Sequence, residues 1–255
     1  MNPLVSVIIP VYNHAHTLKA SIEAIFRQTY RPLEIIVVND GSTDNFDQVV
    51  YECLQLTENN CIGAGSLLSI LSQENSGAPA ARNKGFAASK GEYVIFWDAD
   101  TMAENTMLQK MFDALQKNPQ AAYAYSQFKF GWKVMKSQSF DANKLKQINY
   151  IDTSSLIRRS ALNCHPERSE GSLSGNCPWD ISLKRFQDWD LWLGLLEKGK
   201  TGVFVPEVLY AKIVKGRMGI SNWLPSFMFR LPWKTGGVKR YEEARGVVLR
   251  KHKIS

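Results

Sequence analysis

The stretch Tyr93-Val-Ile-Phe-Trp-Asp-Ala-Asp100 joins a strand pattern to two carboxylates. Its first five residues are β-branched or aromatic, which is typical of a buried strand. Asp98 and Asp100 follow at alternate positions, so one side chain can point to a metal ion and the other to a ribose. Mg²⁺ and Mn²⁺ prefer oxygen ligands and often use one or two carboxylates together with phosphates. The alternative is a solvated turn before a helix near Glu104, but the strand in front favours the metal site.

Working outward from this stretch, short apolar runs alternate with helical patterns. The other predicted buried strands are Val5–Ile9, Glu34–Val38 and Leu67–Leu71. The predicted helices are Thr17–Gln28, Asp44–Leu56 and Pro79–Ala88, each with a start signal. This alternation predicts an α/β fold with a mostly parallel central sheet and helices on both faces. Ligands of such sheets bind at the carboxyl ends of the strands.

The residues that follow the first two strands are polar and rich in turn formers. Pro10-Val-Tyr-Asn13 is not a Gly-x-Gly-x-x-Gly loop, which disfavours a dinucleotide-binding oxidoreductase. Asp40 follows the second apolar run and can accept an N–H from a nucleobase edge, although turn chemistry is an alternative. Asp44 is interpreted as structural, a cap for the next helix.

Two charged residues further along the chain have both a structural and a functional interpretation. Arg82 lies early in a predicted helix, where its charge can add to a helix N-terminus that favours phosphate, although lone helix arginines are usually solvated. Asp188 precedes a stripe of apolar residues at helical spacing. It can cap that helix, or it can act as a general base for an acceptor hydroxyl. Spacing does not separate these two roles.

Nearby residues are weaker candidates for acceptor contacts. Trp179 and Trp189 can stack on an acceptor sugar, and Asp180 can contact the acceptor. Trp192 is more simply explained as core.

Composition limits the partners and the location. The formal net charge of +7 suits nucleotide phosphates, nucleic acid or an anionic membrane equally well, but no nucleic-acid motif is present. The four cysteines have neither Cys-x-x-Cys nor zinc spacing, which favours free thiols in a reducing compartment. Since residues 1–10 do not read as a signal peptide, we expect a cytoplasmic protein. Peripheral contact with the inner face of the cytoplasmic membrane is an open alternative.

Two segments depart from the strand–helix pattern. Asn163–Pro178 is polar, turn-rich and without periodicity, and is interpreted as an inserted surface loop. We expect one domain over residues 1–215 and a basic, aromatic extension over 216–255. Its aromatic residues are either a membrane contact or packed back onto the domain. They are Trp223, Phe227, Phe229 and Trp233.

Five segments together resemble the family-2 inverting glycosyltransferases, which have the GT-A, Rossmann-like fold. They occur in the family's order and approximate spacing between about Pro3 and Tyr210. They are Ser6–Asn13, Val38–Ser42, Asn75–Gly85, Asp98–Asp100 and Gln187–Asp190.

The resemblance implies a role for each matching residue. Pro10, Tyr12 and Asp40 would line the nucleoside pocket, and Arg82 would approach the diphosphate. The remaining assignments are Asp98 on the ribose or sugar, Asp100 on Mn²⁺ or Mg²⁺, and Asp188 as catalytic base.

The same resemblance implies the reaction and its partners. The donor would be a UDP-, GDP- or dTDP-sugar, and the acceptor a saccharide or lipid-linked hydroxyl in bacterial cell-surface polysaccharide or glycolipid synthesis. Many relatives carry a histidine after the last domain strand, where this chain offers Lys215 or Arg217. The Asn163–Pro178 segment lies shortly before Asp188, in the part of the sequence that would bind the acceptor, and it could obstruct that site. A binding protein that no longer transfers, or that only hydrolyses its donor, is therefore the alternative.

Overall fold

The computed structural model describes residues 2–58, 66–162, 177–213 and 235–254. Within these ranges one sheet has the strand order β3-β2-β1-β4-β8-β6-β9-β5, and β7 pairs with β6. The strands are β1 (Val5–Val11), β2 (Leu33–Asp40), β3 (Ser66–Gln73), β4 (Tyr93–Phe96), β5 (Thr101–Ala103), β6 (Ala121–Phe130), β7 (Lys133–Met135), β8 (Leu156–Arg158) and β9 (Thr201–Lys212). The helices are α1 (Ala15–Phe26), α2 (Phe46–Glu58), α3 (Ala78–Ala88), α4 (Met107–Lys117), α5 (Ala142–Gln147), α6 (Arg159–Leu162), α7 (Gln187–Glu197) and α9 (Gly236–Lys251).

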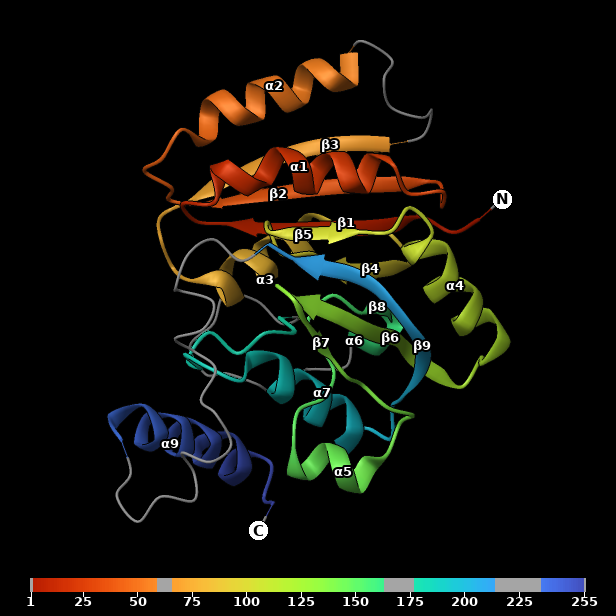
Figure 1. Cartoon of the computed structure of the whole chain (residues 1–255), viewed down its shortest axis with the longest axis vertical. Helices are drawn as coiled ribbons and strands as arrows, with labels where there is room; N and C mark the ends of the chain where they lie inside the picture. The colour runs from red at the N-terminus through yellow and green to blue at the C-terminus, as the bar shows by residue number, and fades with distance from the viewer. Residues whose placement is uncertain (1, 59–65, 163–176, 214–234, 255) are drawn as a thin grey trace.

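The sheet is mostly parallel around its centre. β1 pairs in parallel with β2 and β4, β2 pairs in parallel with β3, and β6 pairs in parallel with β9. β8 is antiparallel to both β4 and β6, so β4 and β6 point the same way. The strands β1, β2, β4, β6 and β9 therefore end on the same side of the sheet, which we call its carboxyl edge. The arrowheads of β6 and β9 lie there in Figure 1.

Helices cover both faces of the sheet, because successive strand side chains point to opposite faces. On β1, Val5, Val7 and Ile9 pack with α1, α2 and α4, whereas Ile8 packs with Phe86 of α3 and the residues of α7. The prediction of an α/β fold with helices on both faces is confirmed.

Two sequence predictions about individual elements need correction. The run Leu67–Leu71 was predicted to be a buried strand, but β3 lies at the edge of the sheet and the Leu67 side chain is 65% exposed. Asp44 was predicted to cap the following helix, α2. Its carboxylate instead accepts a hydrogen bond from the Ala15 N–H at 2.9 Å, which places it at the start of α1.

Only part of the predicted C-terminal extension lies in the described ranges. α9 packs back onto the domain: Val238 and Val248 are buried, and Phe186 meets Tyr241 edge to face. The four aromatic residues predicted to meet a membrane lie in 214–234, outside the described residues, as do residues 163–176 of the predicted loop. No helix in the described ranges is both long and apolar enough to cross a membrane.

Candidate active site

A pocket of about 410 Å³ opens at the carboxyl ends of β1, β2 and β4. The predicted donor-binding residues all line it, together with Asp100, and we call it the donor pocket. Its lining is Pro10, Val11, Tyr12, His14, Asp40, Asn75, Gly77, Ala78, Arg82, Asp98, Ala99 and Asp100. The sheet thus brings together residues that are up to 90 positions apart in the sequence, from Pro10 to Asp100.

Asp40 ties the end of β2 to the start of α3. One carboxylate oxygen accepts from the Ser76 N–H and from the Gln73 side chain, both at 2.8 Å, and the other accepts from the Gly77 N–H at 2.9 Å. Gly41 allows this approach, because a Cβ there would lie 2.9 Å from the backbone nitrogen of Asn75. Asp40 is therefore fixed at the wall of the donor pocket, with the oxygen that accepts a single bond able to accept another.

Asp98 is held between two cations. Its carboxylate accepts from Arg82 at 3.0 Å and from Lys212 at 2.9 Å. Lys212 also pairs with Asp152 at 2.9 Å, and Asp152 accepts from the Tyr210 hydroxyl at 2.8 Å. Burial raises the pKa of Asp98, but the charges of Lys212 and Arg82 outweigh it and lower that pKa. We call Arg82, Asp98, Lys212 and Asp152 the charge bridge.

Asp100 contrasts with Asp98 in its surroundings. Burial, followed by the nearby charge of Asp98, raises the pKa of Asp100. Among the described residues no salt bridge forms to its carboxylate, which lines the donor pocket. No cluster of three or more potential metal ligands occurs in the described ranges. One carboxylate facing a pocket still suits Mg²⁺ or Mn²⁺, since these ions commonly take the rest of their ligands from substrate phosphates and water.

Asp188 lies in the first turn of α7. Phe186 occupies the position before the helix in a left-handed conformation with φ 58°, so Asp188 is not the cap. Its carboxylate accepts from Asn149 at 2.7 Å and from the Trp189 N–H at 2.9 Å. Burial, and then the charge of Asp152, raise the pKa of Asp188. A carboxylate with a raised pKa is a better general base, because its pKa then lies nearer the pH at which the enzyme works.

Asp188 lines a second pocket of about 660 Å³, which we call the acceptor pocket. Its lining is Arg82, Asp152, Thr153, Lys184, Arg185, Phe186, Gln187, Asp188, Lys212 and Tyr241. Arg82 belongs to both pockets, and the charge bridge separates them. Arg82 therefore lies beside a group placed in either pocket.

The structure corrects the three weaker acceptor predictions. Trp179 is 2% and Trp189 1% exposed; both pack in the core, so neither ring offers a face to a sugar. Trp179 instead packs against Arg82, whose guanidinium carbon lies over the Trp179 ring, 4.6 Å from the ring centre. Asp180 forms a salt bridge with Lys251 of α9 and does not line the acceptor pocket.

Lys212 and Asp152 are site residues that were not predicted from the sequence. Both are single charged residues far from the recognised motifs. Lys212 reaches Asp98 because β9 pairs with β5, which sets Lys212 opposite Thr101. The one signal was that a basic residue was expected after the last domain strand. The candidates named for that role, Lys215 and Arg217, lie outside the described residues.

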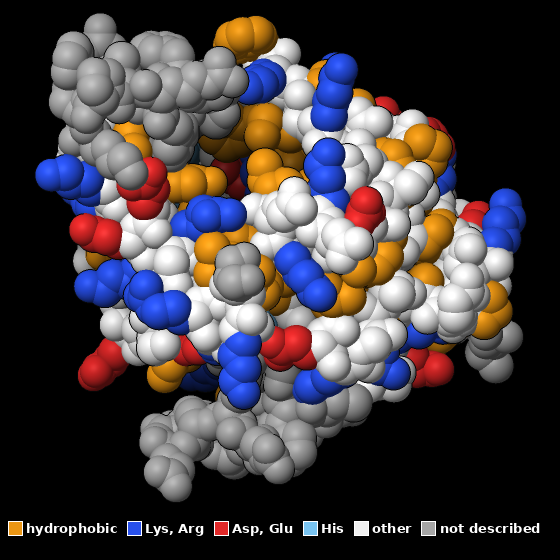
Figure 2. Space-filling view, turned by 90° about the horizontal axis from the view of Figure 1, so that it is seen from below, with side chains coloured by type: hydrophobic (Ala, Val, Ile, Leu, Met, Phe, Trp, Pro, Cys, Tyr) orange, Lys and Arg blue, Asp and Glu red, His pale blue; other side chains and the backbone are white. Residues whose placement is uncertain are grey.

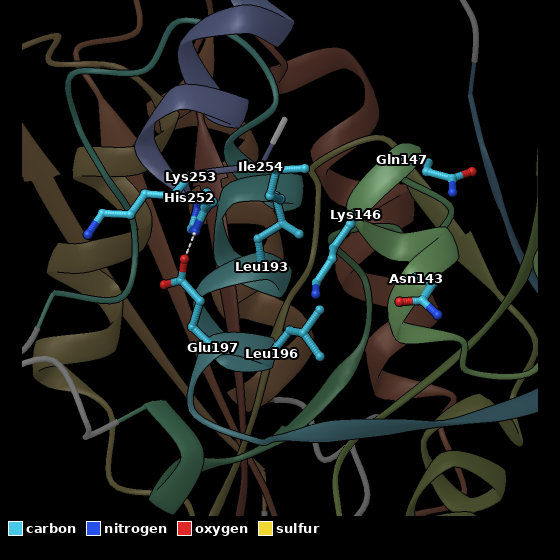
Figure 3. Close-up of a pocket in the computed structure, with 9 residues that line it drawn as sticks. All are labelled: Asn143, Lys146, Gln147, Leu193, Leu196, Glu197, His252, Lys253 and Ile254. Atoms are coloured by element: carbon cyan, nitrogen blue, oxygen red, sulfur yellow. Dashed lines mark hydrogen bonds and ion pairs between the residues drawn. The ribbon is translucent and has the colours of Figure 1, made fainter.

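A larger cavity, of about 710 Å³, lies between α5, α7 and the end of α9 (Figure 3). Lys146 points into it, and His252 bonds Glu197 at 2.7 Å along one wall. The other ring nitrogen of His252 meets the buried carboxylate of Asp190 at 2.8 Å. These contacts fasten α9 to α7. None of the residues predicted for catalysis or donor binding lines this cavity, so its size does not make it the active site.

The fold and the paired pockets define an α/β protein with a charged, two-part site at the carboxyl edge of its sheet. The chain belongs to glycosyl transferase family 2, whose model matches residues 6–165. The predicted GT-A fold and the family resemblance are both confirmed.

Relatives with known names include whole-length and partial matches. A Bacillus subtilis protein assigned to teichuronic acid biosynthesis, the glycosyltransferase TuaG, is 25% identical over 226 residues, covering 87% of this chain and 83% of its own. Glycosyltransferase GlyG of Streptococcus pneumoniae is 35% identical over 118 residues, 46% of this chain and 36% of the relative. The chain thus spans about a third of the length of several curated relatives that it matches.

Solved structures show the same fold at low identity. Staphylococcus aureus TarS 1–349 in complex with UDP has a TM-score of 0.63 and 16% identity, covering 97% of this chain and 71% of that one. Mannosyltransferase PcManGT from Pyrobaculum calidifontis, in complex with GDP-Man and Mn²⁺, has a TM-score of 0.65 and 18% identity over 99% and 71%.

Proposed function

We propose that the protein is a metal-dependent, inverting glycosyltransferase that moves one sugar from a nucleoside-diphosphate sugar to a hydroxyl acceptor. The observation that carries this proposal is the meeting of two pockets at Arg82, with Asp100 facing one and Asp188 facing the other. A transferase needs the donor's anomeric carbon and the acceptor oxygen side by side. The charge bridge occupies the boundary where they would meet.

The donor would bind with its base against Tyr12 and Asp40 and its diphosphate toward Arg82. Pro10 shapes the same wall. The solved structures of similar fold that hold UDP and GDP-Man support a nucleotide-sugar donor. Asp98, predicted to bind the ribose or sugar, also accepts one hydrogen bond on each oxygen, from Arg82 and from Lys212. We therefore assign Asp98 to positioning Arg82 as well as to the donor.

Asp100 would hold a Mn²⁺ or Mg²⁺ ion, which neutralises charge on the departing nucleoside diphosphate. Asp188 would take the proton of the acceptor hydroxyl, with Asn149 fixing its orientation. The acceptor oxygen forms a bond to the anomeric carbon while the bond from that carbon to the diphosphate breaks on the opposite side. One such displacement inverts the configuration at the anomeric carbon.

The similarity to TuaG supports a role in bacterial cell-surface polysaccharide synthesis. We propose that the protein performs this role in the cytoplasm. A domain over residues 1–215 is compatible with this role, although α9 contributes Tyr241 to the acceptor pocket. We therefore place α9 with the catalytic unit.

The test is a panel of UDP-, GDP- and dTDP-sugars measured for thermal stabilisation with and without Mn²⁺, since a ligand of the native state raises Tm. The stabilising donor is then incubated with candidate acceptors, and the anomeric configuration of the product is read by NMR. We expect stabilisation that needs Mn²⁺, and an inverted product. A product of retained configuration contradicts the single displacement. Donor hydrolysis without transfer to any acceptor points to the binding or hydrolytic alternative.

A further inference from the structure

The β6–β7 hairpin carries the most exposed large hydrophobic side chain in the described ranges. Phe130 pairs with Lys133, so Gly131 and Trp132 form a two-residue turn, with Gly131 at φ 58°. Trp132 is 92% exposed. A tryptophan in this position contributes nothing to the core, and its ring is free to meet a partner.

The strand register places this turn beyond the edge where both pockets open. Ile157 of β8 pairs with Val94 of β4 and with Tyr123 of β6, so the end of β4 at Phe96 is level with Tyr125. β6 runs five residues further, which is about 16 Å at 3.3 Å per residue. Its last residue, Phe130, pairs with Lys212 of the charge bridge. The hairpin therefore continues past the end of β4, beside Lys212, which lines the acceptor pocket.

The charged residues of the hairpin and of the segment directly after it, up to residue 140, have one sign. Residues 127–140 contain Lys129, Lys133 and Lys136 and no acidic residue. Lys129 and Lys136 are exposed. Elsewhere the positive side chains are dispersed: on the face seen in Figure 2, Lys and Arg lie among acidic and hydrophobic side chains. The net charge of +7 therefore does not mark that face as a site for an anionic partner. The hairpin differs because it combines positive charge with an exposed aromatic ring.

We propose that the β6–β7 hairpin is a contact for an anionic lipid surface, with Trp132 in the headgroup region and the lysines beside lipid phosphates. Tryptophan favours membrane–water interfaces because its ring is apolar and its N–H is polar. Lysines near such a surface are attracted by its negative potential. A sugar-binding aromatic usually needs hydrogen-bond acceptors for the hydroxyls, but the residues next to Trp132 in the sequence, 127–140, include no carboxylate. The contact orients the catalytic edge toward the membrane.

The test is co-sedimentation of the full chain with phosphatidylcholine vesicles that contain or lack phosphatidylglycerol, at low and high salt. We expect binding only to the anionic vesicles, weakened by salt because screening shortens the reach of surface charges. Trp132→Ala should lower the vesicle partition coefficient by at least about tenfold. Lys129→Gln and Lys136→Gln should each lower it by about fivefold.

The matched control is Tyr51→Ala, which removes another exposed aromatic, 65% exposed, on α2 beside Glu52. This variant should bind vesicles as the unchanged protein does. Absence of vesicle binding, or binding that ignores lipid charge, overturns the proposal. So does binding that survives Trp132→Ala and is lost in Trp223→Ala or Trp233→Ala, since the contact then belongs to the C-terminal extension. An increase in KM for a water-soluble acceptor with unchanged vesicle binding makes Trp132 a sugar contact instead. None of these outcomes depends on which donor the enzyme uses.

Discussion

The donor pocket and the acceptor pocket are built in different ways. The donor pocket is lined by the carboxyl ends of β1 and β2, by the segments that follow β1, β3 and β4, and by α3; Asp40 is held there by three hydrogen bonds. The acceptor pocket takes its residues from five separate stretches, including α7 and α9, and its carboxylate Asp188 has a raised pKa. The donor side is fixed by the sheet, whereas the acceptor side depends on helices packing against it. Substitutions should therefore have different signatures on the two sides.

The largest effect that separates the two pockets is expected at Asp188. Asp188→Asn keeps the shape and the hydrogen bond from the Trp189 N–H but removes the base, so kcat should fall by about 10²–10⁴-fold. Donor affinity, measured by thermal stabilisation with the nucleotide-sugar, should stay unchanged. Asp190→Asn is the neighbouring control, because Asp190 is buried against His252. Normal turnover in Asp188→Asn with a dead but folded Asp190→Asn would show that the wrong carboxylate was chosen.

A difference within the donor pocket is expected between Asp100 and Asp98. Asp100→Ala should lower kcat on the order of a hundredfold by losing the metal ion, and should leave Tm nearly unchanged. EDTA should abolish activity of the unchanged enzyme. Asp98→Ala leaves Arg82 and Lys212 without their shared partner, which should cost about 3–5 kcal/mol of unfolding free energy. Full turnover in EDTA, or an Asp100→Ala protein as unstable as Asp98→Ala, would contradict these separate roles.

A smaller effect is expected on the pH dependence of kcat. The base must be ionised, and its pKa is raised, so activity should fall with decreasing pH at a higher pH than for an ordinary aspartate. Asp152→Asn removes a like charge and should move this acid limb down. Lys212→Met removes a positive charge that lowers the pKa of Asp188 and should move it up. If the acid limb of the pH profile moved in the same direction in both variants, the limb would not report the ionisation of Asp188.

The smallest effect is expected from shortening the irregular segment. Replacing residues 163–176 by a short Gly-Ser linker should leave kcat and Tm close to those of the unchanged protein. The replacement stops before Trp179, whose backbone N–H and C=O both bond the Asn83 side chain, at 3.0 and 2.8 Å. Deletion through Trp179 is the contrasting variant and should destabilise the protein. An insoluble product of the shorter replacement would show that the segment is structural.

The same contrast explains what could be predicted from the sequence. The donor-side motifs follow strands with clear β-branched patterns, and every predicted donor residue lines the pocket. The edge position of β3 was missed because an apolar run such as Leu67–Leu71 does not reveal how many neighbours a strand has. Lys212 and Asp152 were missed because their partners come from remote segments. Trp189 was misjudged because an indole in an apolar stripe fits a core and a sugar platform equally well.

The paired hydrogen bonds between Asn83 and Trp179 also bear on how this family member could acquire extra sequence. Leu162 and Trp179 are both buried, so the chain is fixed on each side of residues 163–176. Under that condition, each doubling in the length of a connecting segment costs only about 0.6 kcal/mol of closure entropy. The Trp179 ring also packs against the guanidinium of Arg82, which lies at the boundary of the two pockets. Trp179 therefore both fixes the chain after residues 163–176 and supports Arg82. Selection for the position of Arg82 would then preserve Trp179, whereas the number of residues between positions 162 and 177 could vary.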